Sequence, residues 1–363
     1  MSVLAAIAVL ALLIVVHELG HFLAARLQGI HVNRFSIGFG PILWKYQGPE
    51  TEYALRAFPL GGFVGFPDDD PDSDIPADDP NLLRNRRVLD RAIVISAGVI
   101  ANLVFAYLIF VTQFSIVGIP EGFDFQPGVV IPQVMAQDSP ASQAGIQDRD
   151  IVLGVDGASL GSGEDAEKKL MAAIAGSPNQ PITLDVQRGE QQLDIAVTPK
   201  PDAQGIARIG VVLNPNGTVQ FRRPNGIGEV FGLAARQFQD MVVRTVQGFV
   251  SLITNFAAVA NQVAGPVKIV EQGASLAASD WINLFPFTAI ISINLAIINI
   301  LPLPALDGGQ LAFLLIEALR GKPLPTRFQE NVMQTGLMLL LGLGVFLIVR
   351  DTSQLAFFKN LLQ

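Results

Sequence analysis

Four long apolar stretches dominate the hydrophobic pattern of the 363-residue chain. A membrane-spanning helix needs about 20 apolar residues, because each residue rises about 1.5 Å along the helix axis. Three stretches are long enough for one span each, namely residues 1–26, 92–118 and 331–350. The fourth, residues 282–318, is too long for one straight span and contains Pro302 and Pro304, which interrupt a helix. The pattern therefore predicts four transmembrane helices, the third of them broken.

The first apolar stretch resembles a signal peptide only in its position. It lacks a basic segment before the apolar core and a small-residue cleavage site after it. It also continues past His17 and Glu18. We therefore expect a helix that is retained.

Lys and Arg residues set the expected orientation. They gather in two loops beside the spans: Arg84, Arg86, Arg87 and Arg91 before the second, and Arg320, Lys322 and Arg327 between the third and fourth. Positive residues close to the ends of spans stay in the cytoplasm. Both loops are therefore expected in the cytoplasm, and the long segment from about residue 120 to residue 280 outside it.

Residues 27–91, between the first two spans, divide into two parts. Residues 44–66 are rich in Tyr, Phe and Gly and are expected to form a β-hairpin; the alternative is an interfacial anchor made of aromatic residues. An acidic run that includes Asp68, Asp69 and Asp70 follows and is interleaved with prolines. Such a composition predicts a flexible, solvated loop.

Residues 124–200 alternate short β-rich runs with one helical stretch. The central part of this sequence runs from Ser139-Pro-Ala, through Ala144-Gly145 and Asp148-Arg-Asp-Ile, to the predicted turn Val155-Asp-Gly157. This arrangement resembles a bacterial PDZ domain. The resemblance implies an inserted α+β domain whose carboxylate-binding loop falls at residues 126–129 and includes Gly128.

Residues 226–263 read as a helical, partly amphipathic stretch. Arg236, Asp240 and Arg244 fall on its polar side, so it is expected to lie on the membrane surface or to pack on the inserted domain. Its polar amides make a fifth span costly, so we do not expect one: they are Gln247, Asn255, Asn261 and Gln262.

Composition supports a membrane protein and narrows the chemistry. Half of the residues are hydrophobic and 15% are charged, against about 25% charged residues in a typical soluble domain. The net charge of −8 argues against a nucleic-acid partner. The absence of cysteine excludes disulfides, thiol nucleophiles and every zinc site built on thiolates.

Away from the ends of the predicted spans, ionisable residues occur in two places only. His17, Glu18 and His21 lie in the first span, and Asp307 lies in the broken one. Ionisable groups at membrane depth are rare and usually functional. The spacing H-E-x-x-H places both imidazoles on one helix face, where they can bind one metal ion, with Glu18 beside them as a general base.

A third metal ligand has to come from elsewhere in the chain, because catalytic zinc usually takes three protein ligands. Asp307 is the candidate: Pro302 and Pro304 interrupt the helix before it, and Gly308 and Gly309 let the chain turn back. The remaining histidine, His31, follows the span and is expected to be an interfacial residue.

These motifs together resemble the bacterial site-2 protease family of intramembrane zinc metalloproteases, in its regulator-of-sigma-E type. The resemblance is carried by H-E-x-x-H, a Gly98/Asn102 pair in the second span, one PDZ domain, and Asn299-Ile-Leu-Pro-Leu-Pro-Ala-Leu-Asp307-Gly. It implies one zinc ion per chain, bound by His17, His21 and Asp307, with Glu18 as the catalytic base. Some members of the family carry two PDZ domains, whereas only one fits in this chain.

The resemblance also implies the substrate and its binding residues. Asn294 and Asn299 match family asparagines placed around the substrate, and Gly61 and Gly62 lie in a re-entrant β region near the active site. An edge of that β region is expected to accept an extended substrate as an added strand. The implied substrates are single-span membrane proteins, such as anti-sigma factors already cut once outside. The implied location is the bacterial inner membrane, with the PDZ domain on the extracytoplasmic side.

Two other classes of protein compete with a protease. A metal transporter would use the same ligands as a transit site, but it needs polar groups in several spans. The second span carries no charge, and the fourth carries none before Arg350 at its end. An inactive PDZ scaffold would be expected to have lost Glu18 or Asp307, and both are present.

Overall fold

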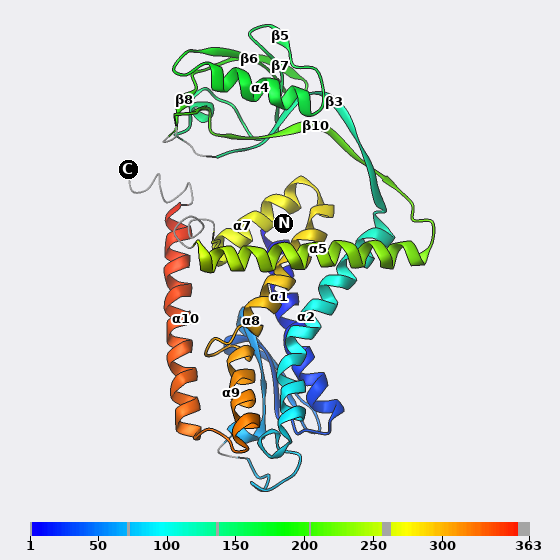
Figure 1. Ribbon diagram of the computed structural model, residues 1–363, viewed down its shortest axis with the longest axis vertical. Helices are drawn as coiled ribbons and strands as arrows, with labels where there is room; N and C mark the ends of the chain where they lie inside the picture. Colours follow the sequence, from blue (N-terminus) through cyan, green and yellow to red (C-terminus); the bar gives the residue numbers. More distant parts are fainter. Residues whose placement is uncertain (1, 71–72, 136–137, 203–204, 256–262, 355–363) are drawn as a thin grey trace. The chain divides into compact units, whose positions relative to one another are not determined.

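The computed structural model describes residues 2–70, 73–135, 138–202, 205–255 and 263–354 (Figure 1). The chain forms two compact units. Unit 1 consists of Met1–Val117 and Pro224–Gln363, and unit 2, the inserted domain, consists of Gly118–Arg223.

Unit 1 is helical, and four of its described helices are long and apolar enough to cross a membrane. These are Ser2–Leu27 (α1), Val88–Ile116 (α2), Trp281–Ile300, which contains α8 (Leu284–Ile300), and Thr326–Ser353 within α10 (Thr326–Gln354). The predicted class, a four-span helical membrane protein with an inserted α+β domain, is confirmed. The predicted break in the third span is also present, because α8 ends at Ile300 and α9 begins at Asp307 (Asp307–Arg320).

The turn between α8 and α9 is folded tightly enough to require glycine. A Cβ at Gly308 would lie 2.1 Å from the carbonyl oxygen of Leu301, and one at Gly309 would lie 2.4 Å from that of Leu303. Ala305 adopts a φ of 70°, which is uncommon for a residue other than glycine. The two glycines thus let the first turn of α9 pack directly against the turn.

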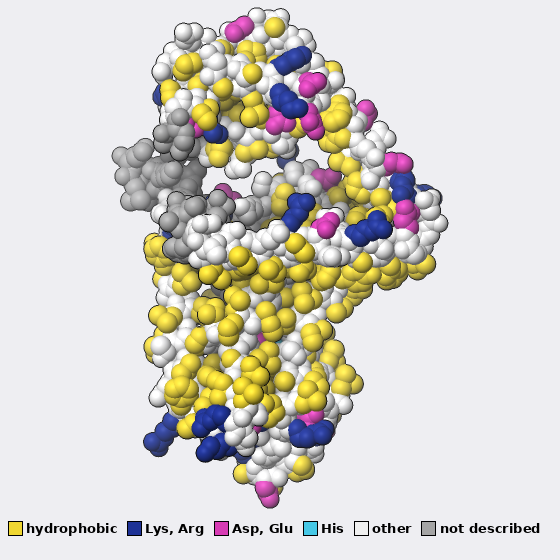
Figure 2. Space-filling model, viewed as in Figure 1, with side chains coloured by type: hydrophobic (Ala, Val, Ile, Leu, Met, Phe, Trp, Pro, Cys, Tyr) yellow, Lys and Arg dark blue, Asp and Glu magenta, His cyan; other side chains and the backbone are white. Residues whose placement is uncertain are grey.

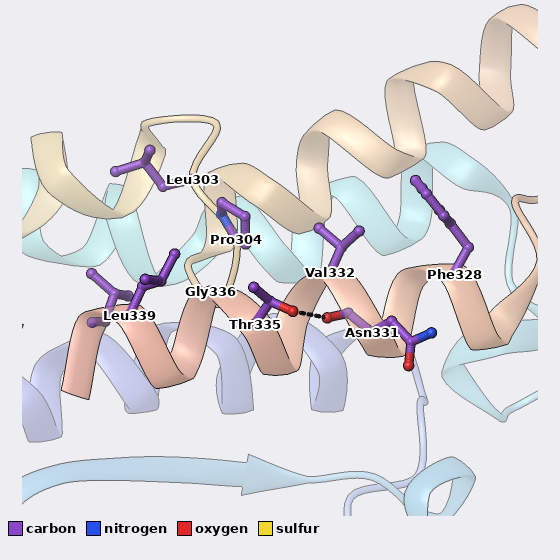
Figure 3. A pocket seen from close by; sticks show the side chains of 9 residues that line it. Leu303, Pro304, Phe328, Asn331, Val332, Thr335, Gly336 and Leu339 are labelled. Atoms are coloured by element: carbon purple, nitrogen blue, oxygen red, sulfur yellow. Dashed lines mark hydrogen bonds between the residues drawn. The ribbon is translucent and has the colours of Figure 1, made fainter. Parts of the chain in front are cut away.

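Helix α10 packs against the same turn through Gly336. A Cβ at Gly336 would lie 2.2 Å from the Cβ of Pro304. Beside this contact is an apolar cavity of about 400 Å³, which Figure 3 shows between α10 and the turn. Its lining includes Leu303, Phe328 and Val332.

Helices α1, α2 and α8 form the core that carries the site. At Gly20 of α1 a Cβ would lie 2.5 Å from the carbonyl oxygen of Ala97, so the backbones of α1 and α2 approach closely. Helix α2 packs on α8 through buried side chains that include Phe110 and Ile293. Because glycine and alanine allow this close approach, residues of three helices meet in a small volume.

The two long strands of unit 1, Arg34–Gln47 (β1) and Glu52–Gly65 (β2), fold back on each other. The start of β1 pairs with both parts of β2, because Ser36 is opposite Ala54 in one register and Phe63 in the other. The predicted hairpin at residues 44–66 therefore begins earlier, at Arg34. The end of β2, up to Gly65, pairs with β1 on one side and has no other strand partner in the described part of the chain.

The acidic run after β2 differs from the prediction. Asp68 accepts hydrogen bonds from the backbone N–H groups of Leu83 and Arg84 at 3.0 and 3.1 Å. Asp70 accepts from the side chains of Asn33 and Arg34 at 3.1 and 2.8 Å. The prediction of a solvated loop is wrong for these two residues, because their carboxylates bind neighbouring chain segments; residues 71–72 lie outside the described part.

Basic residues gather at one end of unit 1, as Figure 2 shows. At this end Arg91 of α2 forms a largely buried ion pair with Glu317 of α9. The pair joins the two basic loops that were predicted to share one side of the membrane. The side on which they lie stays a prediction.

Two further helices complete the described part of unit 1. Ile227–Thr254 (α5) lies across α2 in Figure 1 and packs on it through Val230 and Ala234; it is not among the candidate spans. The predicted amphipathic stretch, 226–263, extends into residues 256–262, which lie outside the described residues. Pro266–Ser279 (α7), which we did not predict, packs on α1, where a Cβ at Gly273 would lie 2.9 Å from the Cβ of Ala6.

Unit 2 is a twisted antiparallel sheet covered by one longer helix. The sheet runs in the order β10-β3-β4-β6-β7, with a short β5 beside β4. Strands β8 and β9 form a separate two-stranded sheet. The elements of unit 2 are Ile119–Val134 (β3), Pro140–Gln143 (α3), Asp150–Val155 (β4), Ala158–Ser159 (β5), Glu164–Gly176 (α4), Ile182–Arg188 (β6), Gln191–Val197 (β7), Lys200–Pro201 (β8), Ala207–Arg208 (β9) and Val211–Arg222 (β10).

The predicted boundaries of the inserted domain, 124–200, are too narrow. Strand β10 pairs antiparallel with β3 along its length, from Val211 opposite Val134 to Arg222 opposite Ile119. Both ends of the domain therefore lie side by side at the end of a two-stranded ribbon.

A buried ion pair fixes the sheet of unit 2. Arg188 of β6 donates to both carboxylate oxygens of Asp150 at 2.8 and 2.7 Å, and the Asp150 side chain is 1% exposed. This hydrogen bonding raises the pKa of Arg188 above its ordinary value. The pair joins β4 to β6 at the edge of the domain core.

Candidate metal centre

The two histidines of the H-E-x-x-H motif lie on one face of α1. Their Nε2 atoms are 3.2 Å apart, and the rings meet edge to face with centroids 4.7 Å apart. His17 is buried, at 8% exposed. One turn of helix therefore presents two nitrogen atoms to one point inside the membrane-spanning part of unit 1.

Asp307, the first residue of α9, completes the cluster. Its Oδ2 lies 3.2 Å from His17 Nε2 and 3.5 Å from His21 Nε2. The three side chains are the group of His, Asp and Glu residues, among those described, whose potential ligand atoms lie within 4.8 Å of one another. The turn at Pro302–Pro304 thus brings a carboxylate to the histidines of α1.

The spacing of these atoms fits a tetrahedral metal ion. Zinc binds His nitrogen and carboxylate oxygen at about 2.0–2.1 Å, so two tetrahedral ligands are separated by about 3.3–3.4 Å. The three observed separations, 3.2, 3.2 and 3.5 Å, match that value. Asp307 Oδ2 is also buried without a well-oriented hydrogen bond from any described residue, as expected of an atom that binds a cation.

His21 is oriented by a second contact. Its Nδ1 donates to the backbone carbonyl of Val94 on α2 at 2.8 Å. With the proton on Nδ1, Nε2 keeps a free electron pair for a metal.

Gly98 gives the histidines their space on α2. A Cβ at Gly98 would lie 2.3 Å from His21 Nε2 and 2.7 Å from His17 Cε1. Any side chain there would displace both rings. The Gly98/Asn102 pair seen in the sequence thus marks the part of α2 that faces the cluster.

Of the two β-region glycines, Gly62 lies against Glu18. A Cβ at Gly62 of β2 would lie 2.8 Å from Glu18 Cγ, whereas one at Gly61 would lie 2.1 Å from the ring of Phe39. Glu18 interacts electrostatically with both histidines and with Asp307. The Glu18 carboxylate therefore lies between the metal-binding cluster and the edge of β2 that has no strand partner among the described residues.

The two asparagines of α8 that were predicted to bind substrate lie on different faces of the helix. Asn299 is buried, and its amide Nδ2 lies 3.2 Å from His17 Nε2. Asn294 is five residues earlier, which at 3.6 residues per turn places it about 140° away around the helix. The structure brings Asn299 to the cluster and leaves Asn294 on another face of α8.

Gly128 belongs to unit 2, and His31 lies apart from the cluster. Gly128 is inside strand β3 and not in a loop, and its N–H donates to the carbonyl oxygen of Gly161 at 2.8 Å. Its part in binding a carboxylate stays a prediction. His31 lies beyond the end of α1 with its Nε2 3.7 Å from Asp79 Oδ1.

Asn102 and Ser292 lie near the cluster, and no role was predicted for either of them. Asn102 is fully buried on α2, with its Nδ2 3.2 Å from His17 Nδ1. Ser292 of α8 donates to the backbone carbonyl of Asn102 at 2.8 Å. An amide in the middle of an uncharged apolar span was the available signal for Asn102.

The chain is similar in sequence to a known peptidase family and to proteins named as metalloproteases. The model of Peptidase family M50 matches residues 5–343. A protein of Nostoc sp. named as a zinc metalloprotease is 62% identical over 98% of this chain and 97% of its own length. The membrane metalloprotease ARASP of Arabidopsis thaliana, a chloroplastic protein, is 50% identical over 99% of this chain and 81% of its own.

Among solved structures, the PDZ domain of an SdrC-like protein from Listeria monocytogenes is similar to part of the chain. It is 19% identical and has a TM-score of 0.22, covering 24% of this chain and 88% of its own.

Proposed function

Because the chain belongs to Peptidase family M50, we propose that it hydrolyses peptide bonds within or near the transmembrane segments of single-span membrane proteins. It is a zinc metalloprotease of the site-2 protease family. The observation that carries the proposal is the convergence of His17, His21 and Asp307 on one point, with Glu18 beside them. The two histidines and Glu18 lie on α1, which is long and apolar enough to cross a membrane, and Asp307 begins α9, shortly after the candidate span that contains α8.

The metal-binding residues would be His17 and His21 through Nε2 and Asp307 through Oδ2, with one ion per chain. When bound, the zinc ion supplies Lewis-acid chemistry, by which it polarises a carbonyl group and acidifies water. His21 is held in the required tautomer by Val94, so its nitrogen needs no rearrangement to bind.

Glu18 moves the protons. Its carboxylate accepts a proton from the attacking water and then passes that proton to the nitrogen of the leaving peptide. The position of Glu18 between the cluster and Gly62 suits this role, because water and the scissile bond have to meet there. Asn299, whose amide Nδ2 lies 3.2 Å from His17 Nε2, would donate a hydrogen bond to the scissile carbonyl oxygen.

The substrate has to be extended before its peptide bond can react, since a helix shields its carbonyl groups. One edge of the end of β2 has no strand partner among the described residues, and the backbone at Gly62 faces Glu18. A substrate strand added to this edge would pass the carboxylate with its backbone exposed. A side chain at Gly62 would close that approach.

The finer physiology is part of the same proposal. We expect substrates such as anti-sigma factors, cut within the membrane after another protease has removed their external part. The inserted domain would lie outside the cytoplasm and admit substrates that keep only a short external stub. The cell membrane of a bacterium is the proposed location, with the two basic loops in the cytoplasm.

Mapping the cut site tests this function. The full chain is purified with zinc, reconstituted in lipid vesicles with tagged single-span proteins, and the fragments are sized by mass spectrometry. We expect new termini within or next to the spans, equal cleavage by the exposed-site control Glu330→Gln, and none after the metal is chelated. Fragments cut only in soluble segments, or cleavage that survives metal removal, would contradict the proposal.

A further inference from the structure

Asn102 is a fully buried polar side chain that the proposed reaction does not use. It lies on α2 with its amide Nδ2 3.2 Å from His17 Nδ1. Its Oδ1 is buried and has no hydrogen-bond partner among the described residues. Buried amides normally pair both ends, so this one calls for an explanation in its surroundings.

The metal-binding atom of His17 fixes where the ring carries its proton. Nε2 faces His21 Nε2 and Asp307 Oδ2, each at 3.2 Å, so this nitrogen has to be free of a proton to bind a cation. A neutral imidazole carries one proton, which then resides on Nδ1. Nδ1 faces Asn102, so the proton needs an acceptor on that amide.

An amide can meet this need without changing its shape. Rotation by 180° about its terminal bond exchanges the oxygen and the NH₂ group, and the hydrogen-bond network decides between the two orientations. With Oδ1 turned toward His17, the amide accepts the Nδ1 proton. The carbonyl of Val94 already does this for His21, so both histidines would then be held by α2 in the same manner.

We propose that Asn102 is a positioning residue that holds His17 in its metal-binding tautomer by accepting the Nδ1 proton. The inference rests on the zinc site of the proposed function. Gly98, one turn before Asn102, leaves room for the rings, and Ser292 of α8 fixes the Asn102 backbone from the other side. Helix α2 thus supplies both the space and the orientation for the two histidines.

Substitutions distinguish this positioning role from a purely structural role, in which Asn102 would only fill space between the helices. Asn102→Leu keeps the approximate volume but removes the acceptor. Asn102→Asp keeps an acceptor of the same shape. Ser292→Ala removes a buried hydrogen bond from the same α2–α8 contact without touching His17, so it is the matched control for packing.

The experiment measures zinc affinity of the purified full-length chain by competition with a chelating dye, and the visible spectrum of the cobalt-substituted protein. We expect zinc binding about 10–100-fold weaker for Asn102→Leu, in line with losses of such supporting contacts. Asn102→Asp should bind at least as tightly as the wild type, and Ser292→Ala within a factor of about three. The cobalt spectrum should change for Asn102→Leu only.

Different outcomes would contradict the positioning role of Asn102 and the proposed function on which it rests. Wild-type affinity in Asn102→Leu, or an Asn102→Asp variant as weak as Asn102→Leu, overturns the positioning role. A wild-type chain that binds no zinc overturns the proposed function itself. Should Asn102→Leu aggregate, the smaller Asn102→Val is compared with Asn102→Asp in the same two measurements, and the same results decide.

Discussion

Replacing Gly98 by alanine should remove zinc from a chain that still folds. The added Cβ would lie 2.3 Å from His21 Nε2. Non-bonded heavy atoms come to rest at about 3.5 Å, so the ring would have to retreat by about 1.2 Å. Metal–ligand distances tolerate changes of about 0.2 Å. The retreat therefore takes His21, and with it His17, out of ligand range.

The expected loss follows from that displacement. Disturbing a group that only supports a ligand lowers metal affinity about 10–100-fold. Moving the ligands themselves should exceed this range, so we expect zinc affinity to fall at least 100-fold, which is about 2.8 kcal/mol. Helix formation should not suffer, because alanine is the better helix former by about 1 kcal/mol.

The assay compares Gly98→Ala with Gly342→Ala. Gly342 is also within a membrane helix, and a Cβ there meets no atom within 4 Å. Zinc affinity is measured by competition with a chelating dye, and helix content by circular dichroism. Both variants should keep their helix content, and only Gly98→Ala should lose zinc. A Gly98→Ala chain that binds zinc as tightly as the wild type would refute the close packing of α2 on the histidines.

Three further predictions concern the third ligand, the inserted domain and its ion pair. Asp307→Ala should lower zinc content of the purified chain at least as strongly as Gly98→Ala, whereas His31→Ala should leave it unchanged; the reverse result would exclude this ligand set. Replacing residues 119–222 by a short Gly/Ser bridge should preserve cleavage of a short-stub substrate and allow cleavage of one with its external domain intact; a folded enzyme that cuts neither would show that the domain takes part in catalysis. Arg188→Met should lower the free energy of unfolding of the domain by about 3 kcal/mol in denaturant unfolding. This value is at the lower end of the range for a buried ion pair, because the Arg188 side chain is 30% exposed. An unchanged unfolding midpoint would show that Asp150 does not need the guanidinium.

The spans and the metal-binding cluster were predictable because each depends on a local pattern. Apolar length defines α1, α2 and α10, and the i,i+4 spacing of His17 and His21 fixes their common face on α1. Asp307 could be found by elimination, because it was the remaining ionisable residue away from the ends of the predicted spans. The contact between the two places followed from the cost of leaving either charge alone in lipid.

The rest depended on pairings between distant segments. Strand β10 lies outside the predicted domain because its sequence, with Pro215 and Gly217, is a weak strand pattern, and only its pairing with β3 defines it. Gly128 lies in a strand where a loop was expected for the same reason, since its hydrogen bond to Gly161 is not visible in the sequence. Asp68 and Asp70 bind partners up to 37 residues away, so a compositional rule treated them as solvated.

Asn294 and Asn299 show the limit of motif matching. Both fit the family pattern, yet the helical repeat turns only Asn299 toward His17. A residue's role at this site is therefore set by the face of α8 that it occupies.

The most direct test of the account is to measure zinc content and peptide-bond cleavage on the same preparations of wild-type and Glu18→Gln chains. Glu18 is placed beside the ligand cluster and is not one of its three ligands. The account predicts equal zinc in both preparations and cleavage by the wild type only. Loss of zinc from Glu18→Gln, or substantial cleavage by it, would contradict the role of Glu18 as the base.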